Sequence, residues 1–247
     1  MSKMRAFQTL GAASALALAA GMAQAAPMLT ITDVSGVWVD ATPIGLASLS
    51  GLNTNDLSWG EGGNRSGYTF DGVTPPDVQA APDDVFDLGY FTHTNLPINA
   101  GTSITQAILE VTFTFLVDAD AANPRTLVSQ FIFDHWETDN GANPCANPAA
   151  DNSNGCADQV VAHTNPTNLD TITIGEHTYT FDVTGFLVGG SPLTEFWTKE
   201  NATNTATLQG RFTYAHNVAE VPLPAGGLLL LGGLAGLGML SRRRKAA

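Results

Sequence analysis

Short apolar and aromatic runs alternate with clusters of Gly, Asn, Pro and Asp between residues 26 and 220. This is the pattern of β-strands separated by turns. In Ile108–Val117 every second residue from Leu109 onward is apolar, and Glu110, Thr112 and Thr114 lie between them. A period of two predicts a strand with one buried face. Helical periodicity is missing from this part of the chain.

Eleven strands are predicted in all, and turn residues recur about every dozen positions between them. A hairpin is expected around Gly175-Glu176. We therefore predict an all-β fold, a β-sandwich of jelly-roll type that forms one domain over residues 26–220. The predicted strands are Leu29–Thr32, Gly36–Asp40, Ser66–Asp71, Val85–Thr92, Thr105–Asp118, Thr126–Trp136, Gln159–Ala162, Thr171–Ile174, His177–Leu187, Glu195–Thr198 and Ala206–Ala215.

The first 25 residues have the features of a secretory signal peptide. Lys3 and Arg5 precede an apolar stretch, Leu10–Ala20, which ends at the small-residue site Ala23-Gln24-Ala25. Cleavage is expected after Ala25. The alternative, a buried Ala-rich helix, does not account for this order of charges.

The segment 221–247 has three parts. The motif Val221-Pro222-Leu223-Pro224-Ala225 leads into a charge-free run over residues 225–240, followed by a basic cluster of Arg242, Arg243, Arg244 and Lys245. As a helix the run would span about 24 Å, enough to predict a transmembrane helix. Basic flanks stay cytoplasmic, which would leave the preceding domain outside. A permanent single-pass anchor keeps the same topology, whereas the many Gly residues argue against a core helix.

This tripartite tail resembles the VPLPA variant of the PEP-CTERM sorting signal of Gram-negative bacteria. The resemblance implies recognition of residues 221–225 by exosortase, a membrane-embedded enzyme. It also implies an inner-membrane intermediate whose domain lies in the periplasm, and then a place at the cell surface or in the exopolysaccharide or biofilm matrix. Whether the tail is cleaved or retained stays open.

Charge is distributed very unevenly along the chain. The formal net charge is −13, and six of the ten basic residues lie in the two terminal segments. The four that remain, Arg65, Arg125, Lys199 and Arg211, are scattered among 23 acidic residues. Nucleic-acid binding needs a clustered basic face and is excluded. Divalent cations are the natural partners of such an acidic domain.

Cys145 and Cys156 are the two cysteines of the chain, and both lie in a stretch rich in Asn, Pro and Gly. In an exported protein this predicts a disulfide bond. A two-Cys metal site is the alternative, but it has neither the CxxC spacing nor a close His.

Hard oxygen ligands are concentrated after the predicted strand Thr126–Trp136. Asp134, Glu137, Asp139 and Asn140 lie within seven residues, and the loop of the predicted disulfide adds Asp151 and Asp158, which together fit a calcium site. The alternative is a solvated hairpin end in which Asp and Asn cap turns. His93 and His135 fit hydrogen-bonding scaffold residues better than transition-metal ligands.

Three polar segments stand at strand ends, and with two upstream runs they carry a second resemblance. Thr92-His93-Thr94-Asn95, with residues 134–140, 198–204, 57–60 and 66–70, resembles the THxN family of PEP-CTERM proteins and the overlapping choice-of-anchor K domains. The family motif residues here are Thr92, His93 and Asn95. The resemblance implies an extracellular domain of unassigned biochemical role, so it assigns no catalytic residue.

These observations predict a non-enzymatic surface or matrix protein that binds polysaccharide. Candidate stacking residues are Trp38, Trp59, Trp136 and Trp197, of which at least three are expected in the core. The alternative is a carbohydrate-active enzyme, a glycoside hydrolase or lyase, built on a β-sandwich. The sequence lacks a Gly-x-Ser-x-Gly elbow, an HExxH motif and a P-loop.

Overall fold

The structure is a computed structural model that describes residues 27–45, 47–61, 63–73, 78–166 and 171–217. Within these residues the chain forms fourteen β-strands. In chain order they are β1 (Leu29–Pro43), β2 (Ser48–Ser50), β3 (Asp56–Gly60), β4 (Ser66–Gly72), β5 (Val78–Ala80), β6 (Val85–Asn95), β7 (Ile104–Val117), β8 (Arg125–Trp136), β9 (Asp158–Thr164), β10 (Thr171–Ile174), β11 (His177–Val188), β12 (Ser191–Leu193), β13 (Glu195–Thr198) and β14 (Ala202–His216).

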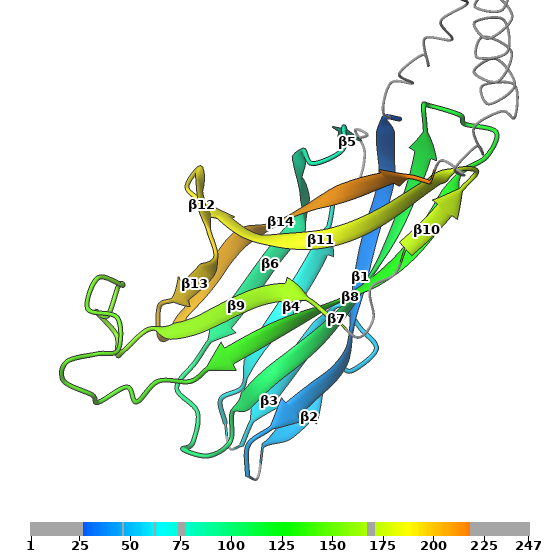
Figure 1. The fold of residues 1–247 in the computed structure, drawn as a ribbon. Coiled ribbons are helices and arrows are strands. Elements are labelled where there is room, and N and C mark those ends of the chain that lie inside the picture. Colours follow the sequence, from blue (N-terminus) through cyan, green and yellow to red (C-terminus); the bar gives the residue numbers. More distant parts are fainter. Residues whose placement is uncertain (1–26, 46, 62, 74–77, 167–170, 218–247) are drawn as a thin grey trace, which may run out of the picture.

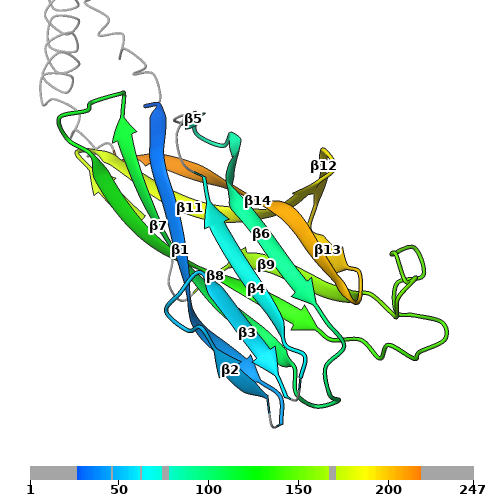
Figure 2. The ribbon, with the colours of Figure 1, turned by 180° about the vertical axis from the view of Figure 1, so that it is seen from behind.

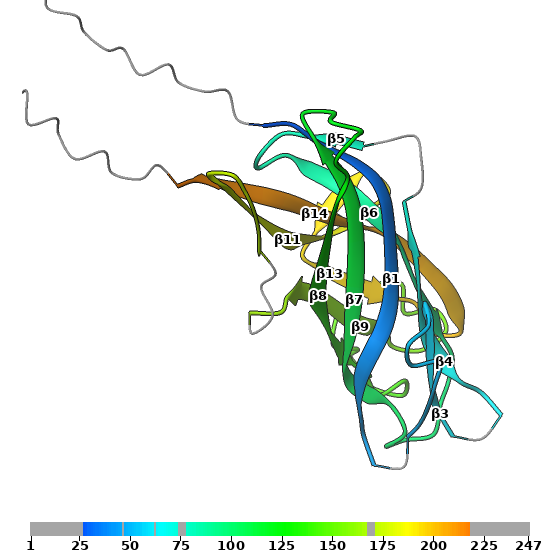
Figure 3. The ribbon, with the colours of Figure 1, turned by 90° about the vertical axis from the view of Figure 1, so that its right-hand side faces the viewer.

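The strands form two antiparallel sheets (Figures 1 and 2). Sheet A has the strand order β13-β9-β8-β7-β1-β5, and sheet B has the order β10-β11-β14-β6-β4-β3-β2, with β12 beside β11. Both sheets curl, as the side view in Figure 3 shows. The all-β prediction is confirmed, and the arrangement is that of a β-sandwich.

Aromatic side chains fill the space between the sheets. The alternation predicted for β7 is confirmed, because Leu109, Val111 and Phe113 have no exposed surface. Phe91 of β6 stacks on Phe133 of β8, with ring centroids 5.1 Å apart and planes 21° apart. This pair joins sheet B to sheet A at the centre of the core.

The predicted strands are mostly confirmed, but their number is wrong. Two predicted runs form the single strand β1, whose pairing with β7 shifts register after Ile31 and after Trp38. Such bulges let a long strand pass over irregular positions without ending. Strands β2, β3, β5 and β12 are short, with three to five residues each, and carry too few apolar positions to show a period.

Two local predictions are confirmed. Ile174 pairs with His177 across the turn at Gly175, where φ is +63°. Cys145 and Cys156 form a disulfide, which uses both thiols and excludes the two-Cys metal site. The disulfide lies in the long connection between β8 and β9.

Both predicted terminal segments, the signal peptide at 1–25 and the sorting signal at 221–247, lie outside the described residues. The described part of the chain contains no helix that is long and apolar enough to cross a membrane.

The contact between the sheets can be tested with Phe133→Ala. We expect a loss of about 3–5 kcal/mol in the free energy of unfolding, because a fully buried ring leaves a cavity. Val128→Ala is the matched control on the same strand, since Val128 is 37 % exposed, and it should cost less than about 1 kcal/mol. Urea unfolding followed by tryptophan fluorescence measures both. Equal losses would contradict the assigned core.

Candidate functional site

Polar side chains gather inside one end of the sandwich, where β6, β8 and β13 end and β4 and β9 begin. Strand alternation turns them inward, among the large aromatic residues. We call this group the polar cluster; its members are Tyr68, His93, Asn95, His135, Glu137, Asp158, Thr198 and Glu200. All are buried except Glu137, whose side chain is 20 % exposed.

His135 links Tyr68 to Glu137. The Tyr68 hydroxyl lies 2.6 Å from His135 Nδ1, and His135 Nε2 lies 3.4 Å from Glu137 Oε2. Burial, followed by the nearby carboxylates, raises the pKa of Tyr68 well above its usual value, so the phenol keeps its proton. We therefore assign Tyr68 as the donor to Nδ1, which leaves the imidazole proton on Nε2, facing Glu137. His135 then orients Glu137, together with the Ser103 hydroxyl, which donates to the same oxygen at 3.0 Å.

Asp158 has one oxygen held and one free. Its Oδ1 accepts a hydrogen bond from the Thr138 backbone N–H at 2.7 Å, whereas its buried Oδ2 has no partner. Burial, with Glu137 as the next cause, raises its pKa to about 7. The Thr138 N–H and His135 thus compensate the charged form of Asp158 only in part.

Glu200 is fully buried, and neither of its carboxylate oxygens has a hydrogen-bond partner. Burial and then the charge of Glu137 raise its pKa. The Asn140 amide, the Asn201 backbone N–H and the Asn95 amide act in the opposite direction, but none of them reaches hydrogen-bonding geometry. Gly155 packs against this group, since a Cβ there would lie 3.1 Å from Glu200 Cγ and 2.6 Å from Asn140 Oδ1. The β8–β9 connection therefore closes directly over Glu200.

His93 and Asn95, two of the family motif residues, point inward. His93 Nδ1 lies 2.9 Å from the Thr198 hydroxyl, and Asn95 Nδ2 donates to the Thr198 carbonyl at 3.2 Å. Burial and then His135 lower the pKa of His93 well below its usual value, which keeps the ring neutral. Thr92 points the other way and pairs with Thr205 at 3.1 Å.

The four residues of the predicted calcium site are divided by the structure. Glu137 belongs to the polar cluster, and Asn140 lies beside Glu200. Asp134 faces outward, where Gln106 Nε2 and His163 Nε2 each donate to it at 2.9 Å. Asp139 is exposed and accepts a hydrogen bond from the backbone of Gly141, as a turn cap does.

Sequence reasoning named Glu137 and Asp158 among the possible calcium ligands, but it did not name Glu200 or predict which of the acidic residues the fold brings together. Glu200 follows β13, and Asp158 begins β9, so both are distant in sequence from residues 134–140. Within the described residues, ligand atoms of His135, Glu137 and Asp158 all lie within 4.8 Å of one another. One sequence signal could have found these residues. Each polar residue lies at a strand end, next to an aromatic or amide residue that faces outward.

A hollow of about 560 Å³ opens beside the cluster. Ile44, Ile98, Ser103, Glu137 and Asp139 are among the residues that line it. Glu137 is therefore the member of the cluster that faces solvent.

The outer face of the same strands carries an aromatic row. Trp136 of β8, Gln159 of β9 and Trp197 of β13 are register partners across sheet A, and the two indole rings lie 6.2 Å apart. Trp136 is 52 % exposed. Glu195 accepts hydrogen bonds from Trp197 Nε1 and from Gln159 Nε2, which fixes the polar edge of the row.

The expectation that at least three Trp residues lie in the core is wrong. Trp38 and Trp59 are fully buried, whereas Trp136 and Trp197 occupy outward positions of their strands. The physical reason is that adjacent inward positions are taken by His135 and Thr198, which belong to the polar cluster.

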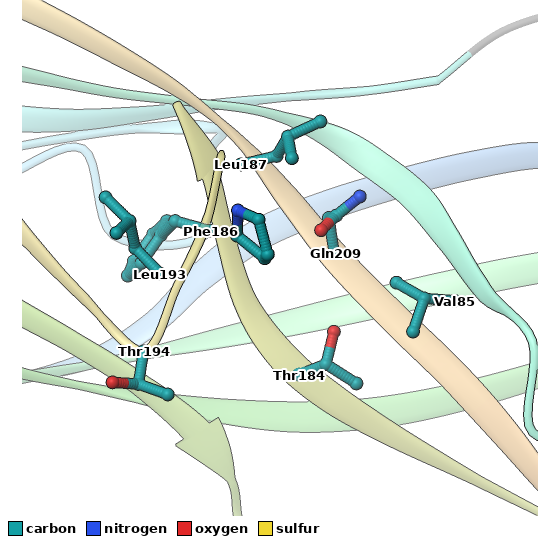
Figure 4. A pocket seen from close by; sticks show the side chains of 8 residues that line it. Val85, Thr184, Phe186, Leu187, Leu193, Thr194 and Gln209 are labelled. Carbon is teal, nitrogen blue, oxygen red and sulfur yellow. The ribbon is translucent and has the colours of Figure 1, made fainter. Parts of the chain in front are cut away.

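A second hollow, of about 400 Å³, lies against β11, β12 and β14 (Figure 4). Phe186, Leu187 and Leu193 supply apolar surface, and Thr184 and Gln209 supply neutral polar groups. No ionisable side chain is present among the described residues that line it, so it offers no group for acid–base chemistry.

Comparison with known proteins assigns no family. No protein-family model and no curated protein matches this sequence. The function must therefore be inferred from the residues and their geometry.

The Tyr68–His135 hydrogen bond gives a prediction about stability. Tyr68→Phe should lower the free energy of unfolding by about 1–3 kcal/mol, because it leaves the buried Nδ1 without a donor. Tyr179→Phe is the matched control, since the hydroxyl of this buried residue has no partner, and it should be close to neutral. Urea unfolding of both variants measures the difference. A neutral Tyr68→Phe would contradict the assigned hydrogen bond.

Proposed function

We propose that the chain is an exported, non-enzymatic surface or matrix protein whose domain, a β-sandwich of jelly-roll type, binds a neutral polysaccharide. The observation that carries this proposal is the aromatic row, in which two partly exposed indole rings flank an amide on one sheet face. Large amphipathic rings at a surface stack on the C–H faces of sugars and keep a polar edge for hydroxyl groups.

Charge supports a neutral ligand. Glu195 lies at the edge of the aromatic row. Val161 of β9 is the register partner both of Glu195 in β13 and of Asp134 in β8. Both side chains are exposed carboxylates. Acidic polysaccharides would meet like charge at this face, whereas neutral ones would not.

The terminal sequences support the proposed location. A signal peptide at 1–25 would export the chain, and the apolar run at 225–240 would hold it in the inner membrane while exosortase acts on residues 221–225. The domain would then reach the cell surface or the matrix, where a polysaccharide ligand is available.

A second candidate function is carbohydrate cleavage by a glycoside hydrolase or lyase. The hollow beside the polar cluster favours it, because Glu137 and Asp139 both line this hollow. Hydrogen bonds from His135 and Ser103 to Glu137 Oε2 argue against this function, because they hold the carboxylate in place. Release of new sugar ends from a polysaccharide panel, lost in Glu137→Gln, would establish the enzyme and refute the non-enzymatic proposal.

The aromatic row can be tested by retention on insoluble neutral polysaccharides. Trp136→Ala and Trp197→Ala should each weaken binding at least about fivefold, since a central Trp at an interface contributes about 1 kcal/mol or more. Tyr90→Ala is the matched control, because Tyr90 is a 56 % exposed aromatic on sheet B. Equal retention of all variants would remove the aromatic row as the binding site.

The sorting motif can be tested by replacing Pro222 and Pro224 with Ala. Pro interrupts a helix, whereas Ala would let a transmembrane helix continue through the motif, so processing should be blocked while membrane insertion persists. Pro192→Ala, outside the motif, is the control. The measurement is the mass and cell fraction of the protein with and without exosortase. Unchanged processing of the double variant would favour a plain membrane anchor.

A further inference from the structure

The carboxylates of Glu137 and Asp158 converge at the polar cluster, and the buried carboxylate of Glu200 interacts with both, with little to balance their charge. Oxygens of Glu137 and Asp158 belong to one group of potential ligand atoms within 4.8 Å, and Glu200 interacts electrostatically with both residues. Asp158 and Glu200 have no exposed surface. Within the described residues, no Lys or Arg forms an ion pair with any of the three.

A second, independent observation points to a ligand. Asp158 Oδ2 and both carboxylate oxygens of Glu200 are buried and have no hydrogen-bond partner. Buried polar atoms in folded proteins nearly always have a partner, and buried charges are paired or coordinate metals. The unpaired oxygen of Asp158, next to the carboxylate of Glu137, and the unpaired oxygens of Glu200 thus call for a positively charged ligand.

From these observations we propose that the polar cluster binds a calcium ion through the carboxylates of Glu137 and Asp158, whose ligand atoms already lie together, and of Glu200, which would close on the ion. These ligands come from the β8–β9 connection, the start of β9 and the turn between β13 and β14. The ion would therefore hold together three segments that are separated from one another in the sequence. This proposal does not rest on polysaccharide binding.

The donor set favours calcium over zinc. All three proposed ligands are carboxylates, and calcium takes six to eight oxygen ligands in flexible arrangements. His135 donates from Nε2 toward Glu137 in the assigned tautomer, so its ring offers no free lone pair on that side. The hollow beside Glu137 lets water supply the remaining ligands.

The test uses the full-length protein, purified in detergent and stripped with a chelator. Calorimetric titration with calcium chloride should give binding near one ion per chain. At calcium well above its dissociation constant, the melting temperature should rise by about 5 °C or more over the value in chelator. Zinc chloride is titrated in parallel.

Variants separate this site from the acidic residues around it. Glu200→Gln and Asp158→Asn should each lower calcium affinity at least tenfold. In chelator, Glu200→Gln should melt no lower than the natural protein, since it removes a buried unpaired charge. This melting temperature shows whether the Glu200→Gln variant folds. Its calcium affinity then tests the proposed site even if Asp158→Asn does not fold.

Asp134→Asn is the matched control. It removes a carboxylate on the outward face of β8 that binds Gln106 and His163, and it should leave calcium affinity within about twofold of the natural value. Three results would overturn the proposal: the absence of both heat and thermal shift with calcium, equal weakening by Asp134→Asn and Glu200→Gln, or stabilisation by zinc alone.

Discussion

An ionised carboxylate taken out of water must meet a compensating charge, and this constraint governs one end of the sandwich. Asp158 and Glu200 are fully buried beside Glu137, and hydrogen bonds satisfy only part of their oxygens. The surrounding aromatic rings lower the local dielectric, which strengthens the repulsion between these groups. A divalent cation would turn this repulsion into attraction, and it would hold the β8–β9 connection and the β13–β14 turn against the core.

Strand alternation places two different surfaces back to back. Inward positions near the ends of β8, β9 and β13 belong to the polar cluster, and the neighbouring outward positions form the aromatic row. Trp136 directly precedes Glu137, and Gln159 directly follows Asp158. A change in the order of the polar cluster would therefore act on the backbone that carries the aromatic row.

The all-β fold could be predicted because a period of two survives in long strands such as β7, where Leu109 and Phe113 are buried. The disulfide was predictable from two cysteines in one loop. The number of strands was not, since bulges join two runs in β1 and the short strands show no period. Glu137, Asp158 and His135 could each be picked out from the sequence as polar candidates, but their grouping with Glu200 could not. Glu200 is brought near Asp158 by the pairing of Thr198 in β13 with Asp158 in β9, a contact that no local sequence pattern records.

The central claim is that the buried carboxylates form a calcium site. The most direct measurement is anomalous diffraction from crystals of the protein grown with calcium. The account predicts a calcium peak bounded by the carboxylates of Glu137, Asp158 and Glu200, at about 2.3–2.6 Å from its oxygen ligands. A peak at Asp134 or Asp139 instead, or ordered water alone between the buried carboxylates, would contradict it.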